Sequence, residues 1–309
     1  MRKLAFIYPG QGAQNAGMGA DFYENSSAAR EVFDKAEEAL ELDLKKLCFE
    51  EDERLHRTEF TQPAMVTTCL AMSRVLKERG VRPDMTAGLS LGEYAAIAAA
   101  GAFEELDAIR LVRKRGILME HAVPSGKGAM CAILGMSSET VENEIREMAD
   151  VTIANYNCPG QIVITGETRA VKRAAEQLKA AGARRTLFLN VSGPFHSPFL
   201  HTAGEELKKE IEKIQIHPLN IPYVSNASAE KVENKEEIGG LLSRGVYSPV
   251  RWQQSIEYMI ADGVDTFIEI GPGKTLSGFM KKINPQVSML HISTWEDVKM
   301  VEEVIGSTI

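Results

Sequence analysis

The sequence feature that most constrains the fold is the pentapeptide Gly88-Leu89-Ser90-Leu91-Gly92, which has the form G-x-S-x-G. It follows a short apolar segment that predicts a strand, and it precedes a run of small residues, Glu93 to Ala100, that predicts a helix. A sharp strand-to-helix turn raises the serine hydroxyl above the sheet edge, and small residues two positions away let the neighbouring backbone pass. The pattern alone leaves two interpretations open, a nucleophile elbow or a glycine-rich turn of any doubly wound sheet.

Composition bounds the class of protein. With 309 residues, 44% of them hydrophobic, the chain can bury one large domain or a large and a small one. The net charge of -8 and the lack of a basic tract argue against nucleic-acid binding. No apolar run reaches membrane-spanning length, and the chain enters a strand where a secreted protein would have a signal peptide. We therefore expect a cytoplasmic protein that binds no membrane, and we expect a monomer.

The four cysteines predict neither a metal site nor a disulfide framework. They are scattered, with no C-x-x-C pair and no histidine at ligand spacing. They are Cys48, Cys69, Cys131 and Cys158. We expect buried free thiols and no metal.

The first strand is predicted at Leu4 to Tyr8, a continuous apolar run that suits a parallel strand covered on both faces. The loop Pro9-Gly10-Gln11-Gly12 follows it, at the carboxyl end of a strand, where open α/β sheets build their sites. A phosphate-binding Walker A loop would need a lysine that is absent here. We therefore expect a loop whose backbone N–H groups face the site.

Two long helices are predicted. Thr61-Gln62-Pro63 opens the first, with a cap and a proline in its first turn, and this helix ends at Gly80. The second runs from Glu104 to about His121, and Arg115 is the lone charge in its apolar stripe. Burying a guanidinium unpaired costs several kcal/mol. Arg115 therefore either snorkels, forms a structural ion pair, or clamps a substrate carboxylate, and the sequence leaves these alternatives open.

The middle of the chain predicts a separate small domain. Its elements follow the order β-α-β-β-α-β, with strands at 129–134, 151–155, 161–165 and 185–191 and helices at 138–148 and 170–180. Hinge-like residues flank it on both sides. We expect an α/β protein in which a ferredoxin-like insert, residues 126–193, interrupts a large α/β-hydrolase-like domain of residues 1–125 and 194–309. A ligand site is expected in the cleft between them.

His196 is the best candidate for a general base. It lies directly after the second hinge between Pro194 and Pro198, where a stiff backbone can aim the ring at the cleft. The remaining histidines lie in predicted helices, polar connections, a turn or a late strand, and we expect structural roles for them. These are His56, His121, His201, His217 and His291.

Seven stretches, in the same order along the chain, resemble the motifs of the malonyl-CoA:acyl carrier protein transacylase family. They are Pro9 to Gly12, Gly88 to Glu93, Arg115-Gly116, Asn155 to Gln161, Phe195 to Ser197, Pro249 to Trp252 and Glu269 to Gly273. Any one of them could arise by chance, whereas all seven in order make the resemblance specific. The resemblance favours a nucleophile elbow at Ser90 over a glycine-rich βα turn without a catalytic role.

The resemblance implies roles for residues of both domains. Ser90 matches the nucleophile and His196 the base, and the backbone N–H groups of Gln11 and Leu91 match the oxyanion hole. Arg115 matches the arginine that pairs with the free carboxylate of malonyl.

Asn155 and Gln161 fall on substrate-binding positions of the small domain. The expected partners are a coenzyme A thioester and acyl carrier protein, which itself carries the phosphopantetheine, and no cofactor is implied.

Two positions depart from the family pattern. Leu89 stands where relatives often have a histidine, and Gly245 stands where a glutamine carbonyl holds the catalytic histidine. A carbonyl needs no side chain, so we keep this role for Gly245. The acidic residues nearest to His196 in sequence are Glu176 and Glu205, so no carboxylate is at hand locally. We expect a main-chain carbonyl of residues 245–247 to orient His196.

The function expected is ping-pong transfer of malonyl from malonyl-CoA to acyl carrier protein, for fatty-acid or polyketide synthesis, through a malonyl ester on Ser90. A serine hydrolase or thioesterase is the alternative, but α/β-hydrolases place an acidic residue and then a late histidine after the serine. A non-catalytic carrier-binding module would have lost Ser90 or His196, and both are present.

Overall fold

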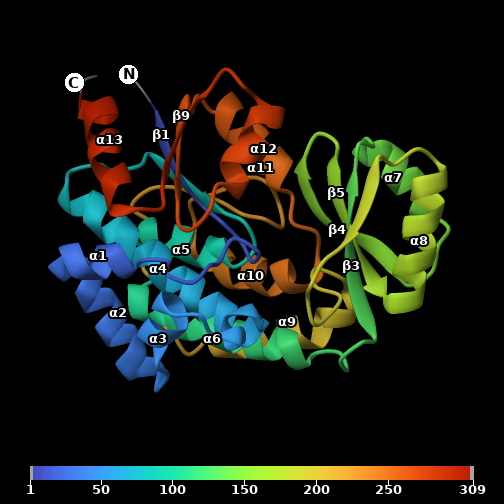
Figure 1. The fold of residues 1–309 in the computed structure, drawn as a ribbon, viewed down its shortest axis with the longest axis horizontal. Coiled ribbons are helices and arrows are strands. Elements are labelled where there is room, and N and C mark those ends of the chain that lie inside the picture. The colour runs from blue at the N-terminus through green and yellow to red at the C-terminus, as the bar shows by residue number, and fades with distance from the viewer. Residues whose placement is uncertain (1–2, 307–309) are drawn as a thin grey trace.

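A computed structural model describes residues 3–306 and contains two β-sheets (Figure 1). The large sheet has the strand order β10-β9-β1-β2-β7-β8, and all neighbours are parallel except the short pair β7 and β8. Its strands are β1 (Leu4–Tyr8), β2 (Met85–Gly88), β7 (Tyr223–Val224), β8 (Lys231–Val232), β9 (Thr266–Ile270) and β10 (Ser288–Ile292). The chain is therefore an α/β protein, as predicted.

Strand β1 lies in the middle of this sheet and is buried along its whole length. Leu4, Phe6 and Tyr8 belong to the core on one face, while Ala5 and Ile7 belong to the core on the other. A strand covered on both faces has no need for polar residues, which explains the continuous apolar run. The predicted strand is confirmed.

Helices cover both faces of the large sheet. On one face pack α11 (Trp252–Ala261) and α12 (Thr275–Ile283). The larger core on the other face includes residues of α1 (Ala20–Asn25), α2 (Ser27–Leu40), α3 (Leu44–Phe49), α4 (Thr58–Glu78), α5 (Gly92–Ala99), α6 (Glu105–His121), α9 (His201–Ile211), α10 (Ile238–Tyr247) and α13 (Trp295–Gly306). Single 3-10 turns occupy Glu53–His56, Pro198–Leu200 and Lys235–Glu237.

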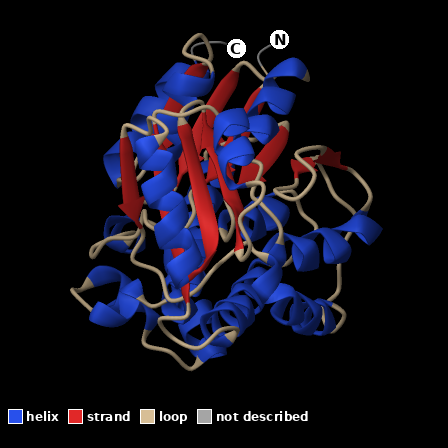
Figure 2. Cartoon of the chain, turned by 90° about the vertical axis from the view of Figure 1, so that its right-hand side faces the viewer, coloured by secondary structure: helices blue, strands red, loops and turns tan. Residues whose placement is uncertain are grey.

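The second sheet is smaller, antiparallel and has its own core, with the order β4-β5-β3-β6. Its elements, in chain order, are β3 (Gly128–Leu134), α7 (Ser138–Ile145), β4 (Val151–Cys158), β5 (Gln161–Glu167), α8 (Thr168–Ala180) and β6 (Arg185–Phe188). Figure 2 looks at the molecule from the side of this small unit.

Main-chain hydrogen bonds tie the small unit to the large one. The N–H of Val250 donates to the carbonyl of Ala154 at 2.8 Å, and the N–H of Tyr156 donates to the carbonyl of Val250 at 2.9 Å. These bonds flank Asn155, which pairs with Val250 in an isolated parallel bridge. The Asn155 segment is therefore held against the large unit by backbone geometry.

The prediction for the start of α4 was wrong. The helix begins at Thr58, so Pro63 lies inside it. Proline lacks an N–H and leaves the carbonyl four residues earlier, that of Glu59, without its helical donor. The guanidinium of Arg113 on α6 donates to that carbonyl instead. A partner from another helix thus compensates for the proline.

Three predicted bounds in the small unit differ from the structure by three residues each. Helix α7 ends at Ile145 and β6 at Phe188, whereas β4 continues to Cys158. The β4–β5 connection needs only Pro159 and Gly160, because Gly160 adopts a left-handed conformation with φ of 75°.

All four cysteines are buried and free, as predicted. Over residues 3–306, no helix is both long and apolar enough to cross a bilayer.

Close packing of α6 on α4 generates a stability prediction. A Cβ added at Gly116 would lie 2.9 Å from Cα of Glu59, on backbone that cannot easily move. We expect Gly116→Ala to lower the free energy of unfolding by about 1–3 kcal/mol, measured by urea denaturation. The control is Gly240→Ala in α10, where an added Cβ meets nothing within 4 Å. We expect this substitution to raise the free energy of unfolding by up to about 1 kcal/mol. Equal stability of the two variants would contradict close packing.

Candidate active site

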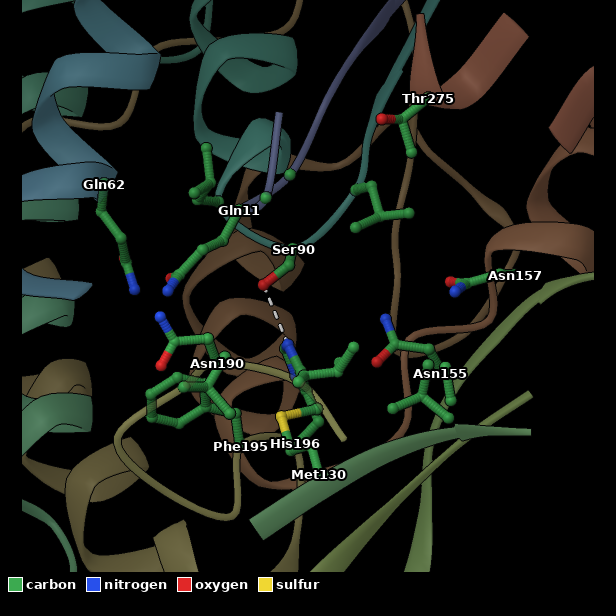
Figure 3. A pocket seen from close by; sticks show the side chains of 18 of the residues that line it. Gln11, Gln62, Ser90, Met130, Asn155, Asn157, Asn190, Phe195, His196 and Thr275 are labelled. Atoms are coloured by element: carbon green, nitrogen blue, oxygen red, sulfur yellow. Dashed lines mark hydrogen bonds between the residues drawn. The ribbon is translucent and has the colours of Figure 1, made fainter. Parts of the chain in front are cut away.

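A cavity of about 380 Å³ lies between the two units. The large unit contributes Ser90, Arg115 and His196 to its lining, and the small unit contributes Met130 and Asn155. Figure 3 shows Ser90 and His196 pointing toward one another, with Gln11 and Gln62 on one side and Asn155 and Asn157 on the other. The cleft expected between the domains therefore contains the predicted residues.

Ser90 lies on the sharp turn between β2 and α5 and has a left-handed backbone with φ of 54°. The turn is very tight, because a Cβ at Gly88 would lie 2.0 Å from the Gly92 backbone. A Cβ at Gly92 would lie 2.5 Å from the carbonyl oxygen of Tyr8 on β1. Both glycines of the G-x-S-x-G pattern are therefore required by close backbone approach.

His196 contacts the serine through one ring nitrogen and a carbonyl through the other. Its Nε2 lies 2.9 Å from Oγ of Ser90, and its Nδ1 lies 2.8 Å from the carbonyl oxygen of Gly245. Gly245 lies in the last turn of α10, where carbonyls have no helical donor. Since a carbonyl only accepts, Nδ1 carries the proton and Nε2 has a free lone pair for the serine hydroxyl. Among the described residues, no acidic side chain hydrogen-bonds to this ring.

Burial and charge both keep His196 neutral. Its ring is 4% exposed, and burial first and the charge of Arg115 second lower its pKa to about 3. The ring therefore stays unprotonated at neutral pH. A base that is already neutral can accept the serine proton without first losing one.

Arg115 is a buried cation that forms no ion pair with a carboxylate of the described chain. Its side chain is held by Gln62, whose Oε1 lies 2.9 Å from Nη1, and by Ser90, whose Oγ lies 3.0 Å from Nη2. The guanidinium also lies over the ring of Tyr94, 5.6 Å from its centroid. Within residues 3–306 no carboxylate lies at ion-pair distance from it, and burial lowers its pKa. Arg115 neither snorkels nor forms an ion pair with the protein.

The backbone groups predicted for the oxyanion hole line the same cavity. In the described chain, the N–H groups of Gln11 and Leu91 donate to no protein acceptor. The side chain of Gln11 forms a separate hydrogen bond, in which its Nε2 donates to Oγ1 of Thr58 at 3.2 Å. Both N–H groups are free to donate to an oxyanion, and this role of Gln11 and Leu91 stays a prediction.

Two strands of the small unit, β4 and β5, contribute three amide side chains to the cavity. Asn155 and Asn157 come from β4, and Gln161 starts β5. Asn155 and Gln161 therefore lie where the resemblance suggested. Asn157 was not singled out from the sequence, although its buried Oδ1 has no hydrogen-bond partner.

Sequence reasoning missed four residues around the dyad. Gln62 was interpreted only as part of a helix start, His56 was expected to be structural although it lines the cavity, and Glu93 was noted only within a motif. Asn226 follows β7, and its side chain contacts the elbow. Its place at the carboxyl end of a sheet strand was a usable signal.

Comparison with known proteins gives a consistent result. Residues 5–301 match the model of a family described as the acyl transferase domain. The chain is 46% identical to a malonyl CoA-acyl carrier protein transacylase from Bacillus subtilis (strain 168), over 99% of this chain and 98% of the relative.

Two solved structures extend the comparison. A malonyl CoA-acyl carrier protein transacylase from Clostridium perfringens superposes with a TM-score of 0.95 at 44% identity, covering 99% of this chain and 98% of its own. A malonyl-transacylase in complex with a type II PKS acyl-carrier protein superposes with a TM-score of 0.95 at 38% identity, covering 98% and 99%.

The buried carboxyl of Glu93 generates a prediction about stability. Burial raises its pKa from 4.5 to about 7. Between these values the folded protein keeps a proton that the unfolded chain releases, so the free energy of unfolding falls as the pH rises through this window and levels off above it. Glu93→Gln should lack this component, which amounts to about 1.4 kcal/mol per pH unit.

Urea denaturation of wild type and Glu93→Gln between pH 5 and pH 8 measures the difference. Glu230→Gln, which changes an exposed carboxylate, is the matched control. Parallel pH profiles for wild type and Glu93→Gln would show that Glu93 ionises as easily in the folded protein as in the unfolded chain.

Proposed function

The chain belongs to the acyl transferase domain family, and we propose that it transfers malonyl from malonyl-CoA to the thiol of acyl carrier protein through an ester on Ser90. The observation that carries this proposal is the buried guanidinium of Arg115, which has no carboxylate partner in the described chain and lies 3.0 Å from Oγ of Ser90. An acyl group that brings its own carboxylate supplies the missing anion.

The first half-reaction forms the ester. His196 Nε2 removes the proton of Ser90 as Oγ attacks the thioester carbonyl. The negative charge that develops on the carbonyl oxygen is placed between the N–H groups of Gln11 and Leu91. The tetrahedral intermediate collapses, the carbon–sulfur bond breaks, and the protonated His196 returns the proton to the leaving coenzyme A sulfur. The supporting contact is the 2.9 Å distance between Nε2 and Oγ.

The second half-reaction reverses the first with a different thiol. The phosphopantetheine thiol of acyl carrier protein gives its proton to His196 and attacks the ester carbonyl. The bond to Ser90 Oγ breaks, and the serine regains its proton from His196. The same oxyanion donors serve both steps, so one site suffices for a ping-pong cycle. This chemistry needs no cofactor, because the phosphopantetheine arrives on the carrier.

The malonyl carboxylate has a second electrostatic effect. Burial first and the charge of Arg115 second lower the pKa of His196. A bound carboxylate compensates that charge, so the histidine becomes a stronger base when the correct substrate is present. Asn155 and Gln161 also line this cavity, which supports the proposal that they bind the remainder of the thioester substrate.

The hydrolase alternative is less well supported. In hydrolase triads an acidic side chain orients the histidine, whereas here the carbonyl of Gly245 occupies that place. Relatives that match nearly the whole chain are named as transacylases, and one was solved with an acyl-carrier protein. The transferase function is therefore favoured over hydrolysis.

We also propose that residues 126–193 form a ferredoxin-like insert in an α/β-hydrolase-like domain of residues 1–125 and 194–309. The element order β-α-β-β-α-β supports this class, as does a sheet in which the insert's first strand lies between its third and fourth.

The ester on Ser90 can be detected directly by the mass of the intact protein. After mixing with malonyl-CoA, we expect the intact mass of the protein to rise by one malonyl group, because the dyad acylates Ser90. Ser90→Ala should show no rise, and holo acyl carrier protein should discharge the wild-type adduct. An adduct that persists in Ser90→Ala would place the nucleophile elsewhere.

Selectivity tests the role of Arg115. We expect Arg115→Ala to reduce malonyl transfer far more than acetyl transfer, since a charge-assisted contact to a carboxylate contributes about 1.5–3 kcal/mol, or roughly ten- to a hundredfold. The measurement is kcat/KM for both thioesters. The matched control is Arg110→Ala, an exposed arginine on the same helix. An equal loss for both substrates would make Arg115 a structural residue.

A further inference from the structure

Asn226 lies directly behind the nucleophile turn and is 2% exposed. Its side-chain Oδ1 accepts a hydrogen bond from the N–H of Ser90 at 2.6 Å. Its Nδ2 donates to the carbonyl oxygen of Gly88, also at 2.6 Å. One amide thus bridges the residues on either side of Leu89.

The orientation of this amide is fixed by its partners. The Ser90 N–H can only donate and the Gly88 carbonyl can only accept, so a flipped amide would lose both bonds. A carboxylate could accept from the Ser90 N–H but could not donate to the Gly88 carbonyl at neutral pH. The position therefore requires an asparagine-like donor and acceptor side by side.

The bridge explains how the elbow keeps its unusual backbone. Ser90 has φ of 54°, a region that residues other than glycine rarely adopt. The bond to Asn226 also uses the Ser90 N–H, whereas the N–H of Leu91 donates to no described protein group. Asn226 thereby determines that the next N–H, and not that of the serine itself, faces the cavity.

Asn226 is itself held firmly from outside the turn. Its N–H donates to Oε1 of Glu93 at 3.2 Å, and its carbonyl accepts from the N–H of Arg251 at 3.0 Å. It follows β7, whose Tyr223 pairs with Thr86 of β2 in the parallel sheet. The elbow is thus tied to the end of the neighbouring strand.

We propose that Asn226 is a positioning residue for the transfer reaction, which fixes Ser90 Oγ toward His196 and the Leu91 N–H toward the substrate carbonyl. The proposal rests on the proposed function of Ser90. It assigns no contact between Asn226 and the substrate.

The decisive variant is Asn226→Asp, which keeps the shape of the side chain. The ionised aspartate accepts a hydrogen bond from the Ser90 N–H but repels the Gly88 carbonyl oxygen. The protonated aspartate can donate to that carbonyl. We expect the rate of malonyl-ester formation, followed by rapid quench and intact mass, to fall at least tenfold at pH 8. The deficit relative to wild type should shrink toward pH 5.5, and the KM for malonyl-CoA should change little because Arg115 is intact.

Glu93, His196 and Arg115 are the titratable groups around the turn, and all three are present in wild type. The ratio of variant to wild-type rate at each pH is therefore the quantity to compare. The matched control is Asn234→Asp, an exposed position where only the side-chain oxygen is used, by the N–H of Glu236. It should follow the wild-type profile.

Asn226→Ala keeps the proposal testable if the aspartate variant does not fold. It should lower the rate of ester formation at least tenfold at every pH, at temperatures below its unfolding transition. If the folded variants formed the malonyl ester at the wild-type rate, the positioning role would be overturned. The same holds if the rate of Asn226→Asp changed with pH in parallel with that of wild type. Neither result would affect the proposed function of Ser90. A wild-type protein that forms no ester on Ser90 would instead overturn the proposed function, and this proposal with it.

Discussion

The site depends on one electrostatic constraint, the guanidinium of Arg115, which is buried beside Ser90 with no carboxylate of the described chain at ion-pair distance. An isolated buried charge is costly, and two neighbours of Arg115 offset only part of that cost. The side-chain oxygen of Gln62 accepts a hydrogen bond from the guanidinium, and the ring of Tyr94 faces it. Under the proposed function, the carboxylate of the acyl substrate completes this unfavourable arrangement. Binding energy from the carboxylate is thereby delivered next to the reacting bond.

The sheet makes this arrangement possible by bringing distant segments to one edge. Gln11 follows β1, Ser90 follows β2 and Asn226 follows β7, and these strands are neighbours in one parallel sheet. Their carboxyl ends therefore meet at the same edge, as in other open α/β sheets. The small unit closes the cavity from the opposite side with residues of β4, including Asn155.

The sequence predicts what local patterns encode. The elbow around Ser90 and the apolar stripe that contains Arg115 could be recognised because each depends on neighbours in the chain or along one helix. The start of α4 could not, because Pro63 is tolerated through a contact with Arg113 from another helix. Asn226 was missed for the same reason, since its contact with Ser90 spans 136 positions and depends on strand order.

The choice of a carbonyl to orient His196 has a chemical consequence. A buried carboxylate would stabilise the imidazolium and strengthen the base, whereas the neutral carbonyl of Gly245 gives only a dipole. Burial first and the charge of Arg115 second lower the pKa of His196, and the hydrogen bond to the Gly245 carbonyl offsets only part of this lowering. A histidine oriented by a carbonyl is a weaker base than one oriented by a carboxylate, in the malonyl ester as well as in the free enzyme. Under the proposed function it activates water less readily while the ester waits for a thiol. Arg115 and Gly245 therefore both affect the basicity of Nε2 of His196, and they do so in opposite directions.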